Sequence, residues 1–171
     1  MEIILCDENN LNDLIEFYNK ETLYLEQNIN YPLWIHGIYP SKYTIKPAVN
    51  KKHQYAYLEN GSILGAFILN EDPGGKYENA KIEFNRGEYL VIHSLGIAHE
   101  YYKKGLATKI IKYCIEKAKK EGYKAVYADI VPTNTPSRKL FEKLGFFYLG
   151  DFDLDRPITG IPLFSLYELK L

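Results

Sequence analysis

One stretch near the middle of the chain combines small residues and lysines at a spacing that suits an anion. Gly105 and Ala107 fall where an apolar, strand-like segment turns into a helix-like one. Small side chains at this point let an anion approach the free backbone N–H groups of the first helical turn, where the helix dipole is also favourable. Lys103 and Lys104 precede the turn, where positive charge is unfavourable unless an anion is bound, although two solvated lysines would give the same pattern. The stretch therefore predicts a diphosphate-binding turn.

This stretch and a later one resemble the Gcn5-related N-acetyltransferases, whose first signature is Gln or Arg, two residues, Gly, one residue, then Gly or Ala. The matching residues are Tyr102-Lys103-Lys104-Gly105-Leu106-Ala107, which depart from the pattern at Tyr102. Residues 134–146, which end in Glu142-Lys143-Leu144-Gly145-Phe146, resemble the second signature. The two signatures occur in the same order as in the family. In the first half of the chain, only the order of the expected helices and strands resembles the family. It implies transfer of an acetyl group from acetyl-CoA to an amine.

The resemblance also implies a fold and a cofactor site. The fold is an α/β, GNAT-like one, with a mixed, mostly antiparallel central sheet, a splayed parallel strand pair and flanking helices. In such a fold the pantetheine arm lies between the parallel strands and bonds strand backbone near Leu95 and Ile97. The residues implied in cofactor binding are Leu95, Gly96, Ile97, Tyr102, Lys103, Lys104, Gly105, Leu106, Ala107, Thr108, Asn134, Ser137 and Arg138.

Two of these residues have a structural interpretation as well. Gly96 lies inside an apolar strand, where glycine often marks a β-bulge or a close backbone approach. Asn134 precedes Thr135 and Pro136, which are themselves a good helix start, so the asparagine could simply lead into the helix cap. Its other role is the cofactor contact that the resemblance implies.

Acetyl transfer to an amine needs a base for the amine, a donor for the developing oxyanion and a proton for the leaving thiolate. We expect the backbone N–H of Ile97 to be the oxyanion donor. His93 is the first candidate for the base, because it precedes the implied bulge on the central strand and imidazole titrates near neutrality. A buried histidine bonded to a backbone carbonyl is the alternative, and Glu88, acting through water, is the second candidate for the base.

The reaction also needs a proton donor for the leaving thiolate. Many members of the resembled family have a tyrosine at the position of Phe141, and phenylalanine cannot donate a proton. Tyr148 is the first substitute, with Ser137 or water as alternatives.

The acceptor is expected to bind beside an aromatic segment. Residues 27–40 are rich in aromatic, glycine and proline residues, which suits a structured loop that lines a cavity or plugs the edge of the core. We predict a pocket for a small-molecule or peptide amine formed by Tyr31, Trp34 and His93, with Tyr24 and Tyr39 as further candidates. The spacing does not select among amines.

The hydrophobic pattern predicts alternating strands and helices. The expected strands are 2–6, 54–58, 62–69, 88–98, 125–130, 146–152 and 164–169, and the expected helices are 10–26, 41–49, 104–121 and 136–143. Glu59-Asn60-Gly61 predicts a hairpin. The polar connection 70–87 has room for a small hairpin. A strand, helix and strand between residues 88 and 130 predict parallel central strands.

Composition limits the remaining choices. The 171 residues are 46% apolar and 25% charged with a net charge of -1, which predicts one globular domain and no general affinity for nucleic acid or membranes. The resemblance implies that this single domain, residues 1–171, is an N-acetyltransferase domain. Without a signal peptide or membrane span, we expect a cytoplasmic protein. Cys6 and Cys114 lack metal-ligand spacing, so no metal site is expected, and Cys114 should be a buried thiol. Exposed late strands make a homodimer plausible, and a noncatalytic acyl-CoA-binding module is the alternative function.

Overall fold

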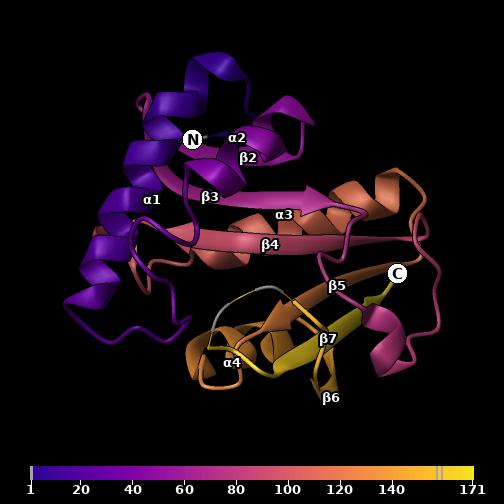
Figure 1. Ribbon diagram of the computed structural model, residues 1–171. Coiled ribbons are helices and arrows are strands. Elements are labelled where there is room, and N and C mark those ends of the chain that lie inside the picture. The colour runs from indigo at the N-terminus through magenta and orange to yellow at the C-terminus, as the bar shows by residue number, and fades with distance from the viewer. Residues whose placement is uncertain (1, 157, 159) are drawn as a thin grey trace. The chain divides into compact units, whose positions relative to one another are not determined.

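A computed structural model describes residues 2–156, 158 and 160–171 (Figure 1). Its strands are β1 (Glu2–Leu5), β2 (Gln54–Glu59), β3 (Ser62–Asn70), β4 (Tyr89–Ile97), β5 (Ala125–Ile130), β6 (Phe147–Phe152) and β7 (Phe164–Lys170). The α-helices are α1 (Leu11–Glu26), α2 (Lys42–Asn50), α3 (Leu106–Lys120) and α4 (Thr135–Lys143). Short 3-10 helices are η1 (Glu8–Asn10), η2 (Tyr77–Ala80) and η3 (His99–Tyr101). The elements predicted from sequence are therefore present, in the expected order.

The strands follow the order β1-β2-β3-β4-β5-β7-β6 in a seven-stranded sheet. β4 and β5 are parallel, with Tyr89 opposite Ala125, whereas the β1–β2, β2–β3, β5–β7 and β6–β7 pairs are antiparallel. This confirms the expected mixed, mostly antiparallel sheet with one parallel pair. The splaying of the parallel strands stays a prediction.

The chain divides into two compact units, and the divisions fall before the last residue of β3 and inside β4 and α3. The first unit contains residues 1–69 and 93–111. Its core joins α1 to α2, β2 and β3 through buried side chains that include Leu14, Tyr18, Ile45, Ala56 and Ala66. Ser41 caps α2 by accepting a hydrogen bond from the Tyr43 amide, as predicted.

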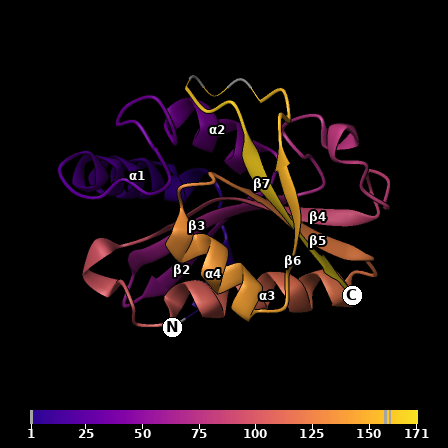
Figure 2. The ribbon, with the colours of Figure 1, turned by 90° about the horizontal axis from the view of Figure 1, so that it is seen from below.

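The second unit contains residues 70–92 and 112–171. Its core is built on β5 and β7, with Tyr127 and Leu166 fully buried, and Tyr77 of η2 packs against Tyr89 and Tyr127. Helix α4 lies beside β6 and β7 (Figure 2). The connection before β4 therefore holds a 3-10 helix where we allowed for a small hairpin, because Tyr77 fills the core and its hydroxyl donates to Asp129 at 2.6 Å.

Both cysteines are free and buried, as expected for Cys114. Burial raises the pKa of the Cys6 thiol to about 12. Neither is a reactive thiolate at neutral pH.

Candidate functional site

The residue of β4 with an irregular backbone is Ser94, and not the glycine at which the sequence suggested a bulge. Ser94 has a φ of 48°, a left-handed conformation that serine rarely adopts within a strand and that is typical of a β-bulge. Two tyrosines hold it: the Tyr18 hydroxyl donates to the Ser94 carbonyl at 2.7 Å, and the Tyr39 hydroxyl shares a 2.9 Å hydrogen bond with Ser94 Oγ. These bonds compensate for the backbone strain.

Gly96 serves the other purpose that we considered, a close approach. A Cβ atom at this position would lie 3.3 Å from Phe17 and 3.4 Å from Trp34, so the bare backbone lets two aromatic rings cover β4. Asn30 fixes Trp34 by accepting from its amide at 3.0 Å and donating to its carbonyl at 2.6 Å. Trp34 therefore lies over the strand segment that carries the predicted chemistry.

The predicted catalytic residues of β4 lie on either side of Ser94. His93 immediately precedes Ser94, and Ile97 follows Gly96; both are half-buried, as is Leu95. Glu88 is a poor base because its ion pair with Lys124 and bonds from Asn85 lower its pKa to about 2. Between these two candidates, the environment favours His93.

The turn before α3 has the features required for an anion. Gly105 has a φ of 81°, and a Cβ atom there would meet nothing within 4 Å, so the backbone is open on this side. Within the described residues, no group accepts a hydrogen bond from the amides of Gly105, Leu106, Ala107 or Thr108; the first amide of this region with a backbone partner is Lys109, bonded to the Gly105 carbonyl at 3.1 Å. Four free donors at the positive end of a helix fit a diphosphate group.

The charged and aromatic residues before this turn are exposed. Lys103 adopts a left-handed φ of 62°. The Lys104 ammonium lies 4.4 Å from the centre of the Tyr101 ring, so this lysine is held in a cation–π contact instead of extending freely into solvent. Tyr102, at the position where the family signature has Gln or Arg, lies on the same turn. Much of its side chain is exposed, but its hydroxyl is partly buried, which raises its pKa to about 12.

The second signature lies in the second unit, at the start of α4. Asn134 is itself the N-cap, because its Oδ1 accepts from the Ser137 amide at 3.3 Å. In the structural alternative Thr135 was the cap, and the observed cap lies one residue earlier. The cap uses one side-chain oxygen and leaves the Asn134 amide group for other contacts.

Arg138 has structural partners that its position in the signature did not indicate. Its Nε donates to the Tyr167 hydroxyl at 3.0 Å and its Nη1 to the Pro132 carbonyl at 3.1 Å. Tyr167 in turn donates to Glu142 at 2.8 Å. The Arg138 guanidinium also lies 5.1 Å from the centre of the Tyr148 ring. Arg138 therefore ties α4 to β7 and positions the tyrosine that we considered as the acid.

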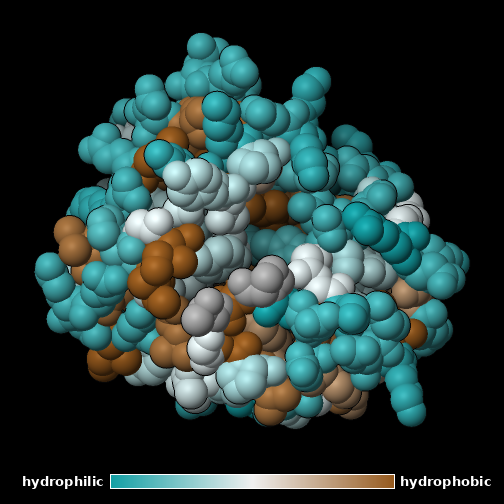
Figure 3. All heavy atoms as spheres, in the orientation of Figure 1, coloured by the Kyte–Doolittle hydropathy of each residue, from teal (hydrophilic) through white to brown (hydrophobic). Residues whose placement is uncertain are grey.

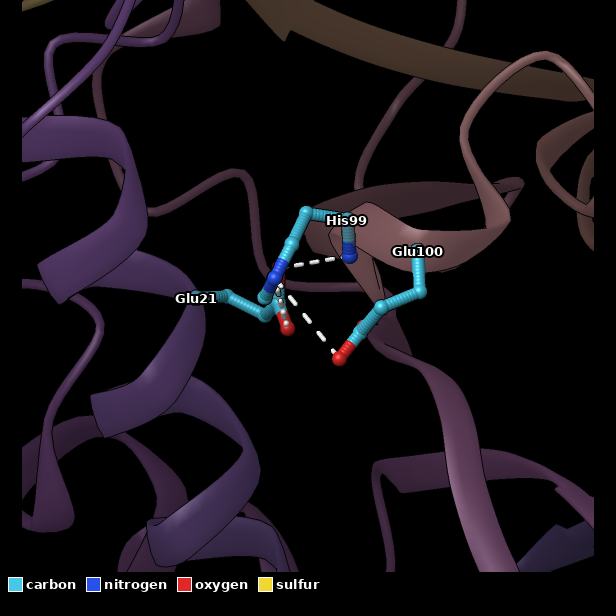
Figure 4. A group of neighbouring side chains, drawn as sticks. All are labelled: Glu21, His99 and Glu100. Carbon is cyan, nitrogen blue, oxygen red and sulfur yellow. Dashed lines mark hydrogen bonds and ion pairs between the residues drawn. The ribbon is translucent and has the colours of Figure 1, made fainter.

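Sequence reasoning missed a group formed by α1 and η3 (Figure 4). Ligand-type atoms of Glu21, His99 and Glu100 lie within 4.8 Å of one another, a spacing that could hold a metal ion. Glu21 nevertheless already accepts from the His99 amide and Nδ1, and Glu100 from Lys20 at 2.6 Å, so these oxygens have partners within the protein. The sequence signal was Glu21 itself, which stands at helical spacing among Leu14, Tyr18 and Leu25 on the buried face of α1.

The segment between α1 and α2 exposes several apolar side chains. Tyr31 of the predicted pocket is 38% exposed, and Ile29 and Ile38 are 67% and 66% exposed. Hydrophobic surface is visible over this segment (Figure 3). Tyr39 and Trp34, by contrast, are half-buried and contact each other edge to face, with ring centres 6.5 Å apart. The segment thus combines aromatics that plug the core edge with others that remain accessible.

Within the described residues, no helix is both long and apolar enough to cross a membrane.

Comparisons with known proteins identify the family and agree with the fold. The model of the acetyltransferase (GNAT) family matches residues 11–146. A GNAT-family acetyltransferase from Streptococcus agalactiae has a similar structure, with a TM-score of 0.78 and 18% identity over 99% of this chain and 95% of that one. A ribosomal-protein-alanine N-acetyltransferase from Brucella melitensis gives 0.72 and 16%, with both chains fully covered. A Salmonella typhimurium protein solved with its cofactor acetyl-CoA gives 0.71 and 18%, over 100% of this chain and 94% of that one.

Proposed function

Because the chain belongs to the acetyltransferase (GNAT) family, we propose that it is an N-acetyltransferase acting on a primary amine of a small molecule or peptide. Acetyl-CoA is the cofactor of this family and supplies an activated acetyl group as a thioester. The observation that carries the proposal is the start of α3, where four amides lack a partner among the residues that the structure describes, beside an open Gly105. These donors suit the diphosphate of coenzyme A.

The cofactor would be held mainly by backbone. The amides of Gly105, Leu106, Ala107 and Thr108 would bind the diphosphate, and Lys103 would add positive charge beside it. Strand backbone from Leu95 to Ile97 would bind the pantetheine arm. In the second unit, the Asn134, Ser137 and Arg138 side chains would contribute further contacts. The departure at Tyr102 removes one side-chain contribution and leaves the backbone donors unchanged.

Three residues would share the chemistry. His93 would take a proton from the attacking amine, so that a neutral nucleophile reaches the thioester carbon. The Ile97 N–H would donate to the carbonyl oxygen as negative charge develops there. Tyr148 would protonate the departing thiolate; a phenol is already protonated at neutral pH, as an acid must be, and burial and a hydrogen bond with Asp151 raise its pKa further.

The acceptor would bind near Tyr31 and Trp34. Trp34 covers β4 at Gly96, which follows Ser94 by two residues and His93 by three. An amine seated against this ring lies on the strand that carries both the proposed base and the proposed oxyanion donor. Exposed apolar side chains in the same segment favour an acceptor with a hydrophobic part.

Turnover of acetyl-CoA against a panel of amines tests the proposal. We expect thiol release that depends on one class of amine, together with binding of coenzyme A measured by calorimetry. Binding without turnover over a broad panel would support the noncatalytic acyl-CoA-binding alternative. Absence of binding would contradict both.

His93→Gln tests the base on the amine that emerges from this panel. Glutamine keeps the size and hydrogen-bonding capacity of histidine but cannot take up a proton, so kcat should fall by about a hundredfold or more. Coenzyme A affinity should be preserved, and the acidic limb of the pH–rate profile should disappear. His93→Ala should behave in the same way. An unchanged pH–rate profile in His93→Gln would remove the assignment.

A further inference from the structure

Glu21 is a buried acidic side chain for which the proposed function has no role. Its side chain is 2% exposed. Glu21 Oε2 accepts from the backbone amide of His99 at 2.9 Å, and Nδ1 of the same histidine lies 3.1 Å from this oxygen and 3.2 Å from Oε1. An ionised carboxylate can only accept, so Nδ1 carries a hydrogen and donates it. Glu21 thus holds one residue by both its main chain and its side chain (Figure 4).

The other neighbours of His99 orient the ring. Tyr24 stacks on the imidazole with ring centres 3.9 Å apart and planes 9° apart. On the opposite nitrogen, Nε2 lies 3.6 Å from Glu100 Oε1, which is also paired with Lys20 at 2.6 Å. Glu100 is exposed, whereas Glu21 is not. Nδ1 is therefore held by a buried carboxylate, whereas Nε2 lies beside a solvated one at a distance longer than a hydrogen bond.

His99 occupies the point where β4 ends and the anion-binding turn begins. The preceding Ala98 is bonded to Leu64 of β3 through its amide at 2.9 Å, and the His99 carbonyl accepts from the Tyr102 amide at 3.2 Å. His99 opens η3, and no side chain of the preceding residue caps that turn. Glu21, 78 positions away, supplies the missing acceptor for the first amide.

We propose that Glu21 is a positioning residue for cofactor binding: through its two hydrogen bonds to His99 it fixes the turn that presents the amides of Gly105 to Thr108. This inference rests on the proposed function. Without the carboxylate, the His99 amide and Nδ1–H lose their acceptor, and η3 is free to shift with the amides that follow it. Displaced donors bind a diphosphate less well even though none of them is altered.

Two substitutions at this position separate geometry from charge. Glu21→Leu fills the space but accepts no hydrogen bond, so KM for acetyl-CoA and Kd for coenzyme A should rise about tenfold or more, the cost of losing a hydrogen bond to a charged group. At saturating acetyl-CoA, kcat should fall by less than about threefold, because the reacting groups are untouched. Glu21→Gln keeps an acceptor for the His99 amide and should restore Kd to within about threefold of wild type.

His99 supplies a second test in case Glu21→Leu does not fold. His99→Asn keeps a side-chain N–H near the position of Nδ1 and should retain affinity, whereas His99→Ala loses this donor and should bind coenzyme A more weakly. The matched control is Glu100→Gln, which removes a carboxylate from the other side of the same ring and should leave Kd unchanged within about twofold.

Each outcome distinguishes this inference from the proposed function. If the wild-type protein does not bind coenzyme A, the proposed function fails and this inference with it. If the wild type binds, a Glu21→Leu protein with a normal Kd for coenzyme A overturns the inference alone. Equal losses of affinity in Glu21→Leu and Glu100→Gln would do the same, as would a decrease in kcat of Glu21→Leu as large as its increase in KM. In the absence of folded Glu21→Leu, equal affinities of His99→Asn and His99→Ala would overturn it.

Discussion

Glu21 places its carboxyl group where charge is unfavourable. Burial raises its pKa above the usual value of 4.5, and the contacts with His99 only partly oppose this shift. A raised pKa in the folded state means that folding favours the protonated acid. Wild-type stability should therefore fall as pH rises from the unfolded-state pKa through the folded-state pKa, and remain lower above it.

Glu21→Gln, which resembles the protonated acid, should remove this pH dependence. We expect its free energy of unfolding to match that of the wild type near about pH 4 and to exceed it at about pH 8. Urea unfolding across this range measures the difference. A variant that is less stable than the wild type at neutral pH would show that the carboxylate is a net stabilising group.

Glu100→Gln is a control at the other side of the His99 imidazole, and its effect on stability at neutral pH should be opposite to that of Glu21→Gln. The hydrogen bond from Lys20 lowers the pKa of Glu100, so its charge contributes stability above the unfolded-state pKa that is lost as pH falls through the folded-state value. Removing it should lower stability slightly at neutral pH, because the pair is exposed and screened by solvent.

Single residues also mark the limit of what the sequence could reveal. The glycine and lysine spacing around Gly105 predicted the tight turn before α3 because glycine has a recognisable conformational preference, and anion binding at this turn stays a prediction. Ser94 carried no such signal, since its left-handed conformation depends on hydroxyls from Tyr18 and Tyr39, which come from distant parts of the chain. Glu21 carried a weak signal, a charge on an apolar helix face, but its partner His99 could not be identified without coordinates.

At the scale of elements, helix α3 offers a matched pair of glycines. Gly105 precedes it with a φ of 81°, and Gly122 follows it with a φ of 82°; a Cβ atom would meet nothing within 4 Å at either position. Alanine at each should therefore cost stability for the same reason, about 1 to 2 kcal/mol for a left-handed backbone. Thermal or urea unfolding measures this cost.

The two variants should differ in cofactor binding. Gly105→Ala places a methyl group beside the amides that we propose to bind the diphosphate, so Kd for coenzyme A should rise about tenfold or more. Gly122→Ala lies at the other end of the helix and should leave Kd unchanged. Equal Kd values in the two variants, at equal losses of stability, would contradict the diphosphate assignment.

Element boundaries followed the sequence where local chemistry defines them. Ser41 caps α2, and the Asn60-Gly61 turn joins β2 to β3, with positive φ at both residues, because these motifs need only neighbouring residues. Residues 77–80 form η2 instead of a hairpin because Tyr77 packs into a core made by strands far along the chain. Local pattern thus predicts the turns and caps, and tertiary packing decides the irregular connections.

At the scale of the whole molecule, the division into two units crosses three elements, and it separates only the last residue of β3 but cuts β4 and α3 near their middles. Residues 89–92 of β4 belong to the second unit and 93–97 to the first, and α3 is divided between Ile111 and Lys112. Unfolding of either unit would remove the support of half a strand and half a helix in the other. We therefore expect one cooperative transition, as predicted for a single domain over residues 1–171.

Fluorescence can follow the two units separately because the chain has a single tryptophan. Trp34 reports on the first unit. Combining Trp34→Phe with Phe152→Trp moves the reporter to a partly buried position against the core of the second unit. In a single domain the two reporters should give urea midpoints that each coincide with the far-UV circular dichroism transition of the same protein. Circular dichroism records both units at once, and a cooperative chain cannot unfold one unit before the other. Fluorescence and dichroism curves that differ within either protein would therefore mean that the units unfold independently.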